Sequence, residues 1–188
     1  MKIHISPLTF LYFAVCLTCS HSLTVVAVCT AVLIHELTHL ILLWWMGARA
    51  SALTITPIGL SIERSGMLSH IEEVWLCLSA PLINLILAGG FAYFSLDRFT
   101  VEVNLCLGMI NLLPIVPLDG GKALLAMLSH YASEEAARRI MGIVSAFFML
   151  ILWLLAVSIC VVLNGSISLL LLVSGLFISA ADFDKRYK

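Results

Sequence analysis

The stretch His35-Glu36-Leu37-Thr38-His39 decides what fold and chemistry we expect, because it lies inside the unbroken apolar run Leu23 to Met46. A run of that length is enough for a helix that crosses a membrane. On a helix, residues four apart share one face, so His35 and His39 can bind one metal ion with Glu36 beside it as a base for water. The pattern is typical of zinc proteases, and here it falls within the membrane.

The placement of Glu36 strengthens this interpretation. An ionisable side chain near the centre of a membrane helix costs about 2.5–3.5 kcal/mol on insertion scales, so such residues are usually functional. The alternative is a chance match, in which the histidines and the glutamate face a polar cavity and bind nothing.

The composition indicates an all-α polytopic membrane protein with one domain over residues 1–188. Of the 188 residues, 62% are hydrophobic and 11% are charged, against about 25% charged in soluble domains. The net charge of −1 gives no sign of nucleic-acid binding. At about 20 residues per span, we expect six transmembrane helices, in the segments Ile5–Ser20, Leu23–Met46, Ile71–Leu96, Val101–Leu128, Ile140–Leu163 and Ile167–Ala181.

The basic residues predict the orientation of these spans. With six helices, both termini share one side with the loops after the second and fourth helices, and that side holds Lys2, Arg49, Arg64, Arg138, Arg139, Lys185, Arg186 and Lys188. The opposite loops hold only Arg98, so both termini are expected to be cytoplasmic. Lys122, inside the fourth segment, is expected to snorkel toward the same face. A removable signal peptide is the competing interpretation of the first segment.

Asp119 is the candidate for a third metal ligand, which catalytic zinc sites usually need beside two histidines and a water. Pro114 and Pro117 break the helical hydrogen bonds before it, and Gly120-Gly121 allows close backbone approach, so we expect an unwound or kinked stretch. His39 and Asp119 lie about 10 Å and about 13 Å from the inner ends of their helices, so their depths agree. The alternative is that Asp119 only caps the helix that follows.

Residues 48–69, between the second and third helices, are too polar to span a membrane. Thr54-Ile55-Thr56 and the residues after Pro57 alternate and turn like a small membrane-associated β-hairpin. Its edge could hold an extended substrate by strand addition. The alternative is an ordinary loop.

The two motifs together, HExxH in one helix and Asn111-x-x-Pro-x-x-Pro-Leu-Asp119-Gly in another, resemble the site-2 protease family of intramembrane zinc metalloproteases. The resemblance implies His35, His39 and Asp119 as ligands of one zinc ion per chain. It also implies Glu36 as the catalytic carboxylate, with Asn111 positioning the substrate or stabilising the oxyanion. From the residues alone, Asn111 could instead join two helices.

The resemblance extends to the segment Ser79 to Asn84, which is similar to the family's small-residue motif in the third helix. Helix packing is the expected role of that motif, with Asn84 a lesser candidate for the site.

Within that family, the opening Lys2-Ile3-His4 and the basic tail resemble the sporulation group. This implies a bacterial cell membrane, on the mother-cell side of the forespore membrane, and a membrane-associated sigma-factor precursor as substrate. Inhibitory membrane proteins are implied partners, and an oligomer is compatible with the resemblance. Members of the group usually carry a CBS domain after the sixth helix. We expect none here, and loops this short leave no room for a PDZ domain.

Two other functions are compatible with the sequence. One is a site-2 protease that acts on another membrane regulator such as an anti-sigma factor. The other is a membrane zinc-binding or transport protein, in which the same ligands form a transit site. Glu36 distinguishes these classes, because hydrolysis needs a carboxylate acting on water whereas transport needs only ligands that exchange.

Overall fold

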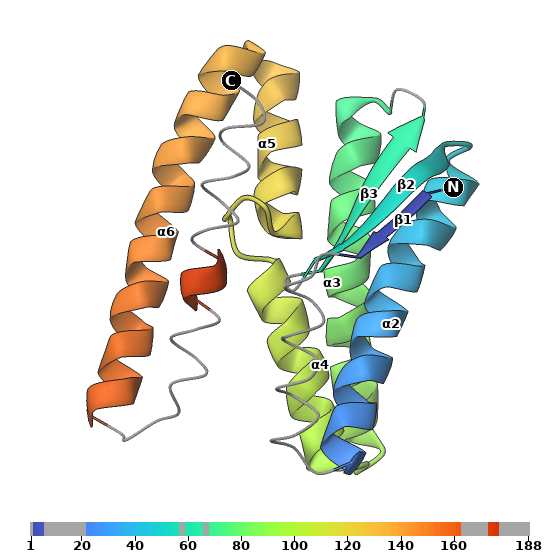
Figure 1. Cartoon of the computed structure of the whole chain (residues 1–188), viewed down its shortest axis with the longest axis vertical. Coiled ribbons are helices and arrows are strands. Elements are labelled where there is room, and N and C mark those ends of the chain that lie inside the picture. The colour runs from blue at the N-terminus through green and yellow to red at the C-terminus, as the bar shows by residue number, and fades with distance from the viewer. Residues whose placement is uncertain (1, 6–21, 57–58, 66–67, 163–172, 177–188) are drawn as a thin grey trace. The chain divides into compact units, whose positions relative to one another are not determined.

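The computed structural model of this chain describes residues 2–5, 22–56, 59–65, 68–162 and 173–176 (Figure 1). The chain divides into two compact units, Met1–Asn111 and Leu112–Lys188. Among the described residues, the first unit holds three helices and a three-stranded sheet, and the second holds a helix of 13 residues and one of 29.

The described helices of the first unit are α2 (Ser22–Trp45), α3 (His70–Tyr93) and α4 (Arg98–Asn111), and each contacts the other two (Figure 1). Gly108 marks a close approach of α4 to α3. A Cβ atom there would lie 2.9 Å from both the Leu85 side chain and the carbonyl oxygen of Pro81. Small residues at a helix contact are how membrane helices pack closely, since apolar burial alone does not favour association in lipid.

The ends of α2 and α3 are fixed by local hydrogen bonds. After α2, Gly47 has φ +74°. Its N–H donates to the carbonyl oxygen of Trp44, and the N–H of Ala48 donates to the carbonyl oxygen of Leu43. This is a Schellman ending, which favours glycine because the left-handed conformation crowds a Cβ atom. Before α3, the Ser69 side chain accepts from the Glu72 N–H while the Glu72 carboxylate accepts from Ser69, a capping box that starts the helix.

A small sheet in the same unit has the strand order β1-β2-β3, with β1 (Lys2–Ile5), β2 (Arg49–Thr56) and β3 (Gly59–Ser65). The hairpin that we expected between the second and third helices corresponds to β2 and β3, which pair antiparallel from Thr56 opposite Gly59. The sequence did not reveal β1, which pairs parallel to β2. A strand of four residues is too short for an alternating pattern to stand out.

The second unit contains α5 (Asp119–Tyr131) and α6 (Glu134–Val162), which lie side by side in Figure 1. Only two residues separate these helices, so they run in opposite directions. Alanines are buried on both, among them Ala126 on α5 and Ala137 on α6.

Three described helices are long and apolar enough to cross a membrane: Val25–Trp45, His70–Tyr93 and Glu134–Val161. They correspond to the second, third and fifth expected spans. The first expected span, and the sixth apart from one helical turn at residues 173–176, fall outside the described residues.

The fourth expected span, Val101–Leu128, contains the unwound stretch that its prolines predict. The structure has α4 and α5, of 14 and 13 residues, with residues 112–118 between them. Each is about 20 Å long, short of the about 30 Å of a bilayer core. The break is larger than a kink because Pro114 and Pro117 each remove a backbone donor and clash with the preceding turn.

Candidate metal centre

His35 and His39 lie four residues apart on α2, so both imidazoles project from one face of the helix. Both side chains are buried, at 5% and 8% exposure. Their ring centroids are 5.1 Å apart and the rings are nearly perpendicular, at 86°. Two imidazoles held this closely on consecutive turns are placed as expected for ligands of one metal ion.

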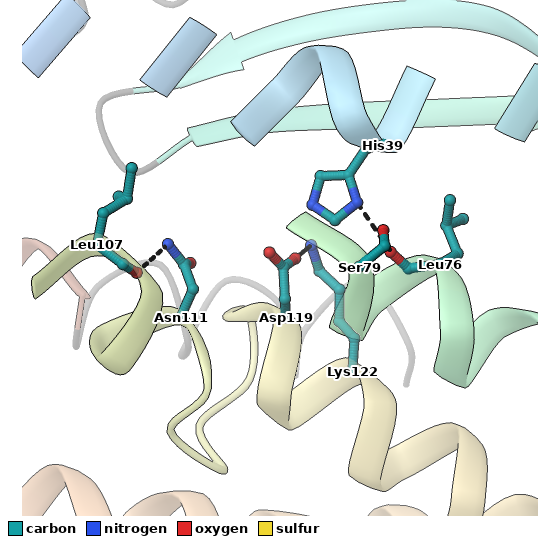
Figure 2. Close-up of polar contacts among 7 residues, drawn as sticks. All are labelled: His39, Leu76, Ser79, Leu107, Asn111, Asp119 and Lys122. Atoms are coloured by element: carbon teal, nitrogen blue, oxygen red, sulfur yellow. Dashed lines mark hydrogen bonds and ion pairs between the residues drawn. The ribbon is translucent and has the colours of Figure 1, made fainter. Parts of the chain in front are cut away.

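The Nδ1 atom of His39 lies 3.0 Å from the carbonyl oxygen of Leu76 on α3 (Figure 2). A backbone carbonyl can only accept, so Nδ1 carries the hydrogen of this bond. In the neutral ring, Nε2 then carries the lone pair that can bind a metal. The Ser79 hydroxyl donates to the same carbonyl oxygen, at 2.8 Å.

His35 has a similar contact to α3, but to a side chain. Its Nδ1 atom lies 2.8 Å from Oδ1 of Asn84. The Asn84 amide nitrogen in turn lies within 3.0 Å of Asn104 on α4 and 3.4 Å of the Ala31 carbonyl oxygen on α2. Helix α3 therefore supports both imidazoles. The sequence pointed to Asn84 only as a lesser candidate, and Asn104 was missed although a polar residue within a membrane helix was the signal that could have found it.

The other two candidate residues of the first unit are Glu36, the expected base, and Asn111, the expected donor to the oxyanion. Glu36 is half-buried and follows His35 directly on α2. Asn111 is the last residue of α4, and its Nδ2 atom donates to the Leu107 carbonyl oxygen at 3.0 Å (Figure 2). An amide nitrogen has two hydrogens, so this contact uses one and leaves the second as a donor for another group.

In the second unit, the first turn of α5 packs directly on the loop before it. A Cβ atom on Gly120 would overlap the backbone of Leu112, and one on Gly121 would overlap the backbone of Ile115. The expected close approach at this glycine pair is therefore present. The Val116 N–H also donates to the hydroxyl oxygen of Ser145 on α6, at 3.1 Å, and that serine is buried.

Asp119 is the first residue of α5 and is buried, at 7% exposure. Its Oδ1 atom lies 3.5 Å from the ammonium nitrogen of Lys122 (Figure 2). A carboxylate in the first turn of a helix also meets the positive end of the helix dipole. The contact between Lys122 and Asp119 was not anticipated from the sequence.

Among the described side chains, the buried imidazole and carboxylate groups are His35, His39 and Asp119. Two imidazole nitrogens and a carboxylate oxygen are a donor set typical of catalytic zinc. The residues present therefore fit a zinc ion. An HExxH pair with both rings oriented, on a helix able to cross a membrane, is the arrangement typical of one class of protein, the membrane metallopeptidases.

Comparison with known proteins agrees with this class. Residues 93–155, from the end of α3 through most of α6, match Peptidase family M50. The chain is 32% identical over 171 residues to stage IV sporulation protein FB of Bacillus subtilis (strain 168), covering 84% of this chain and 59% of that protein. It is 27% identical over 148 residues to a zinc metalloprotease of Methanocaldococcus jannaschii, covering 71% of this chain and 43% of that one.

The fold has a solved counterpart. The site-2 protease from Methanocaldococcus jannaschii matches with a TM-score of 0.69 and 20% identity, over 96% of this chain and 89% of that one. Residues 93–155 therefore match a domain of Peptidase family M50, the site-2 protease family, and the expected resemblance to that family is confirmed. The expected resemblance to the sporulation group is confirmed as well. This chain spans about three fifths or less of the length of the two curated relatives.

Proposed function

We propose that this chain is an intramembrane zinc metalloendopeptidase that hydrolyses a peptide bond in or near the membrane segment of its substrate. The observation that carries the proposal is the arrangement of His35 and His39. Hydrogen bonds at Nδ1 leave the lone pair of each ring on Nε2, and both residues lie on a helix long enough to span a membrane. A protein that only stored or passed zinc would have no use for Glu36 in the next position.

The proposed ligands of one zinc ion are His35, His39 and Asp119. Support comes from the burial of all three and from the local backbone that presents Asp119, where the glycine pair and the prolines fix the first turn of α5. When bound, zinc supplies Lewis acidity, which lowers the pKa of a coordinated water toward about 7 and polarises a carbonyl.

The remaining steps belong to two side chains of this protein. Glu36 removes a proton from water and later returns it to the leaving amine, the usual work of a general base positioned beside the reacting group. Asn111 donates its second amide hydrogen to the oxyanion that develops on the substrate carbonyl. The first hydrogen, bonded to Leu107, holds the amide in place for this role.

The proposed substrate is a membrane-associated sigma-factor precursor, and the proposed partners include inhibitory membrane proteins. The support is the 32% identity to a protein named for stage IV of sporulation. We further propose a single protease domain in a bacterial cell membrane with both termini cytoplasmic, from the distribution of Lys and Arg. The hairpin of β2 and β3 would then lie at the cytoplasmic membrane face, where an edge strand could hold the substrate in extended form.

The test is cleavage of a co-expressed sigma-factor precursor, followed by gel mobility, with the zinc content of each purified variant measured. We expect wild type and His130→Ala, which alters an exposed histidine on α5, to process the precursor. Glu36→Gln should retain zinc without processing, and Asp119→Asn should lose both. If wild type binds stoichiometric zinc and cleaves neither this precursor nor an anti-sigma factor, the transport alternative gains support.

A further inference from the structure

Two asparagines lie at the contact of α3 and α4 with almost no exposed surface: Asn84 at 0% and Asn104 at 2%. A buried amide without hydrogen bonds is costly, and more so in a membrane, where water is not available to replace a missing partner. Both amides are bonded, and they form one continuous series from α4 through α3 to His35 on α2. We call this series the asparagine chain.

A backbone carbonyl on α4, at the end of the asparagine chain away from His35, fixes which side of each amide is the donor and which is the acceptor. The Thr100 carbonyl oxygen can only accept, so the group of Asn104 that lies 2.9 Å from it is the Nδ2 donor. Oδ1 of Asn104 therefore faces Asn84. A flipped Asn104 amide would place two acceptors against each other at Thr100, which excludes the opposite assignment.

The same reasoning fixes the next amide. Asn84 donates from Nδ2 to Oδ1 of Asn104 at 3.0 Å, and the Ala31 carbonyl oxygen, 3.4 Å away, also requires a donor on that side. Oδ1 of Asn84 is thus left facing Nδ1 of His35 at 2.8 Å. Since Oδ1 can only accept, Nδ1 of His35 carries the hydrogen, and Nε2 carries the lone pair.

We infer that Asn84 and Asn104 are positioning residues that set which nitrogen of His35 binds the metal and how its ring is aimed. The inference rests on the proposed function, in which His35 is a zinc ligand. His39 offers a contrast, because its Nδ1 donates to the Leu76 backbone carbonyl, which no substitution of a side chain removes directly. His35 is the ligand whose tautomer depends on side chains.

The experiment compares Asn84→Leu, Asn84→Asp and Asn104→Leu with the control Thr30→Val, which alters an exposed hydroxyl bonded within α2 itself. The first readout is the pair of imidazole nitrogen chemical shifts of His35 in metal-free protein labelled with ¹⁵N-histidine. The spectrum is taken at about pH 8, where an ordinary imidazole is neutral, and the signals are assigned by their loss in His35→Ala. The second readout is zinc affinity, by competition with a chelating dye.

We expect wild type and Thr30→Val to show only the tautomer with hydrogen on Nδ1. Asn84→Leu should show a mixture and bind zinc about 10–100-fold more weakly, the usual effect of losing a partner that orients a metal-binding histidine. Asn104→Leu leaves the Asn84 amide held only by the 3.4 Å contact to Ala31, so it should change both readouts in the same direction but by less. Asn84→Asp keeps the acceptor for Nδ1 but loses the donor to Asn104 and Ala31, so it should keep the wild-type tautomer of His35, which is the readout that tests the acceptor.

Two results would overturn the inference. One is an Asn84→Leu protein whose tautomer and zinc affinity match wild type within twofold. The other is an Asn84→Asp protein with the same mixture of His35 tautomers as Asn84→Leu, since the acceptor that faces Nδ1 would then be irrelevant. If Asn84→Leu fails to fold, Asn104→Leu provides the test instead, because it removes the acceptor that holds the Asn84 amide rather than the amide itself. Failure of the proposed function looks different: wild type and His35→Ala would bind zinc equally, while the tautomer spectrum would still report on the asparagine chain.

Discussion

The backbone N–H of Val116 donates to the buried hydroxyl oxygen of Ser145, joining the loop before α5 to the middle of α6. The prolines of this loop interrupt its helical hydrogen bonds. The Ser145 hydroxyl therefore supplies the Val116 N–H with an acceptor that the backbone does not provide.

Replacement of Ser145 by alanine should therefore destabilise the protein. A buried N–H left without an acceptor costs about 1–3 kcal/mol, and we expect a loss in that range. The measurement is thermal unfolding in detergent, followed by helical circular dichroism. Ser158→Ala is the matched control, because that hydroxyl is exposed and bonds only to the Leu154 carbonyl oxygen of its own helix. Equal effects of the two substitutions would contradict a role for the bond between Val116 and Ser145.

Alanine at Gly121 should be damaging, whereas alanine at Gly142 should not. A Cβ atom at Gly121 would overlap the Ile115 backbone, while one at Gly142 on α6 meets nothing within 4 Å. Because backbone cannot move aside as a flexible side chain can, we expect a loss of at least about 1–3 kcal/mol for Gly121→Ala. Gly142→Ala should be neutral or slightly stabilising, as alanine has the higher helix propensity. Similar unfolding midpoints for the two variants would argue against the close packing.

Gly47→Ala should also destabilise, for a different reason. No atom crowds this position, but its φ of +74° lies in the left-handed region, which costs an L-residue about 1–2 kcal/mol. Gly89→Ala, inside α3 with open space around it, is the comparison and should change stability in the opposite direction. Urea titration of the two variants in the same micelles measures the difference. A harmless Gly47→Ala would mean that α2 does not need this ending.

Zinc should raise the thermal stability of the wild-type protein, because a ligand that binds only the folded state stabilises it by mass action. At a free zinc concentration of about 100 times Kd, the gain is about 2.7 kcal/mol. A chelator should reverse the gain. His39→Ala should show no zinc-dependent shift, while His130→Ala should respond as wild type does, since His130 is exposed on α5. A full zinc response in His39→Ala would remove that residue from the proposed ligand set.

The sequence was sufficient for those features that depend on spacing along one helix. The four-residue interval between His35 and His39 predicted a shared face, and the structure has both rings there, 5.1 Å apart. The prolines and glycines before and after Asp119 likewise predicted an irregular stretch followed by close backbone packing, which the structure contains. These predictions rest on local geometry that the residue types themselves impose.

Features that depend on contacts between distant segments were not predictable from one sequence. Asn104 lies in an apolar helix with no motif around it, and its importance appears only when Asn84, twenty residues earlier, is seen to donate to it. In the same way, β1 is recognised only by its pairing with β2. Apolar periodicity gave little help, because side chains that face lipid and side chains that face other helices are both apolar in a membrane protein.

Helix α3 supplies no proposed zinc ligand, yet the groups that orient both imidazoles, Leu76 and Asn84, lie on it about 12 Å apart along its axis. Any tilt or slide of α3 against α2 alters both hydrogen bonds at once. Helices that do not match the thickness of their bilayer adjust by tilting. The affinity of the proposed site for zinc should therefore vary with the acyl-chain length of the surrounding lipid, which would make the bilayer a determinant of metal binding.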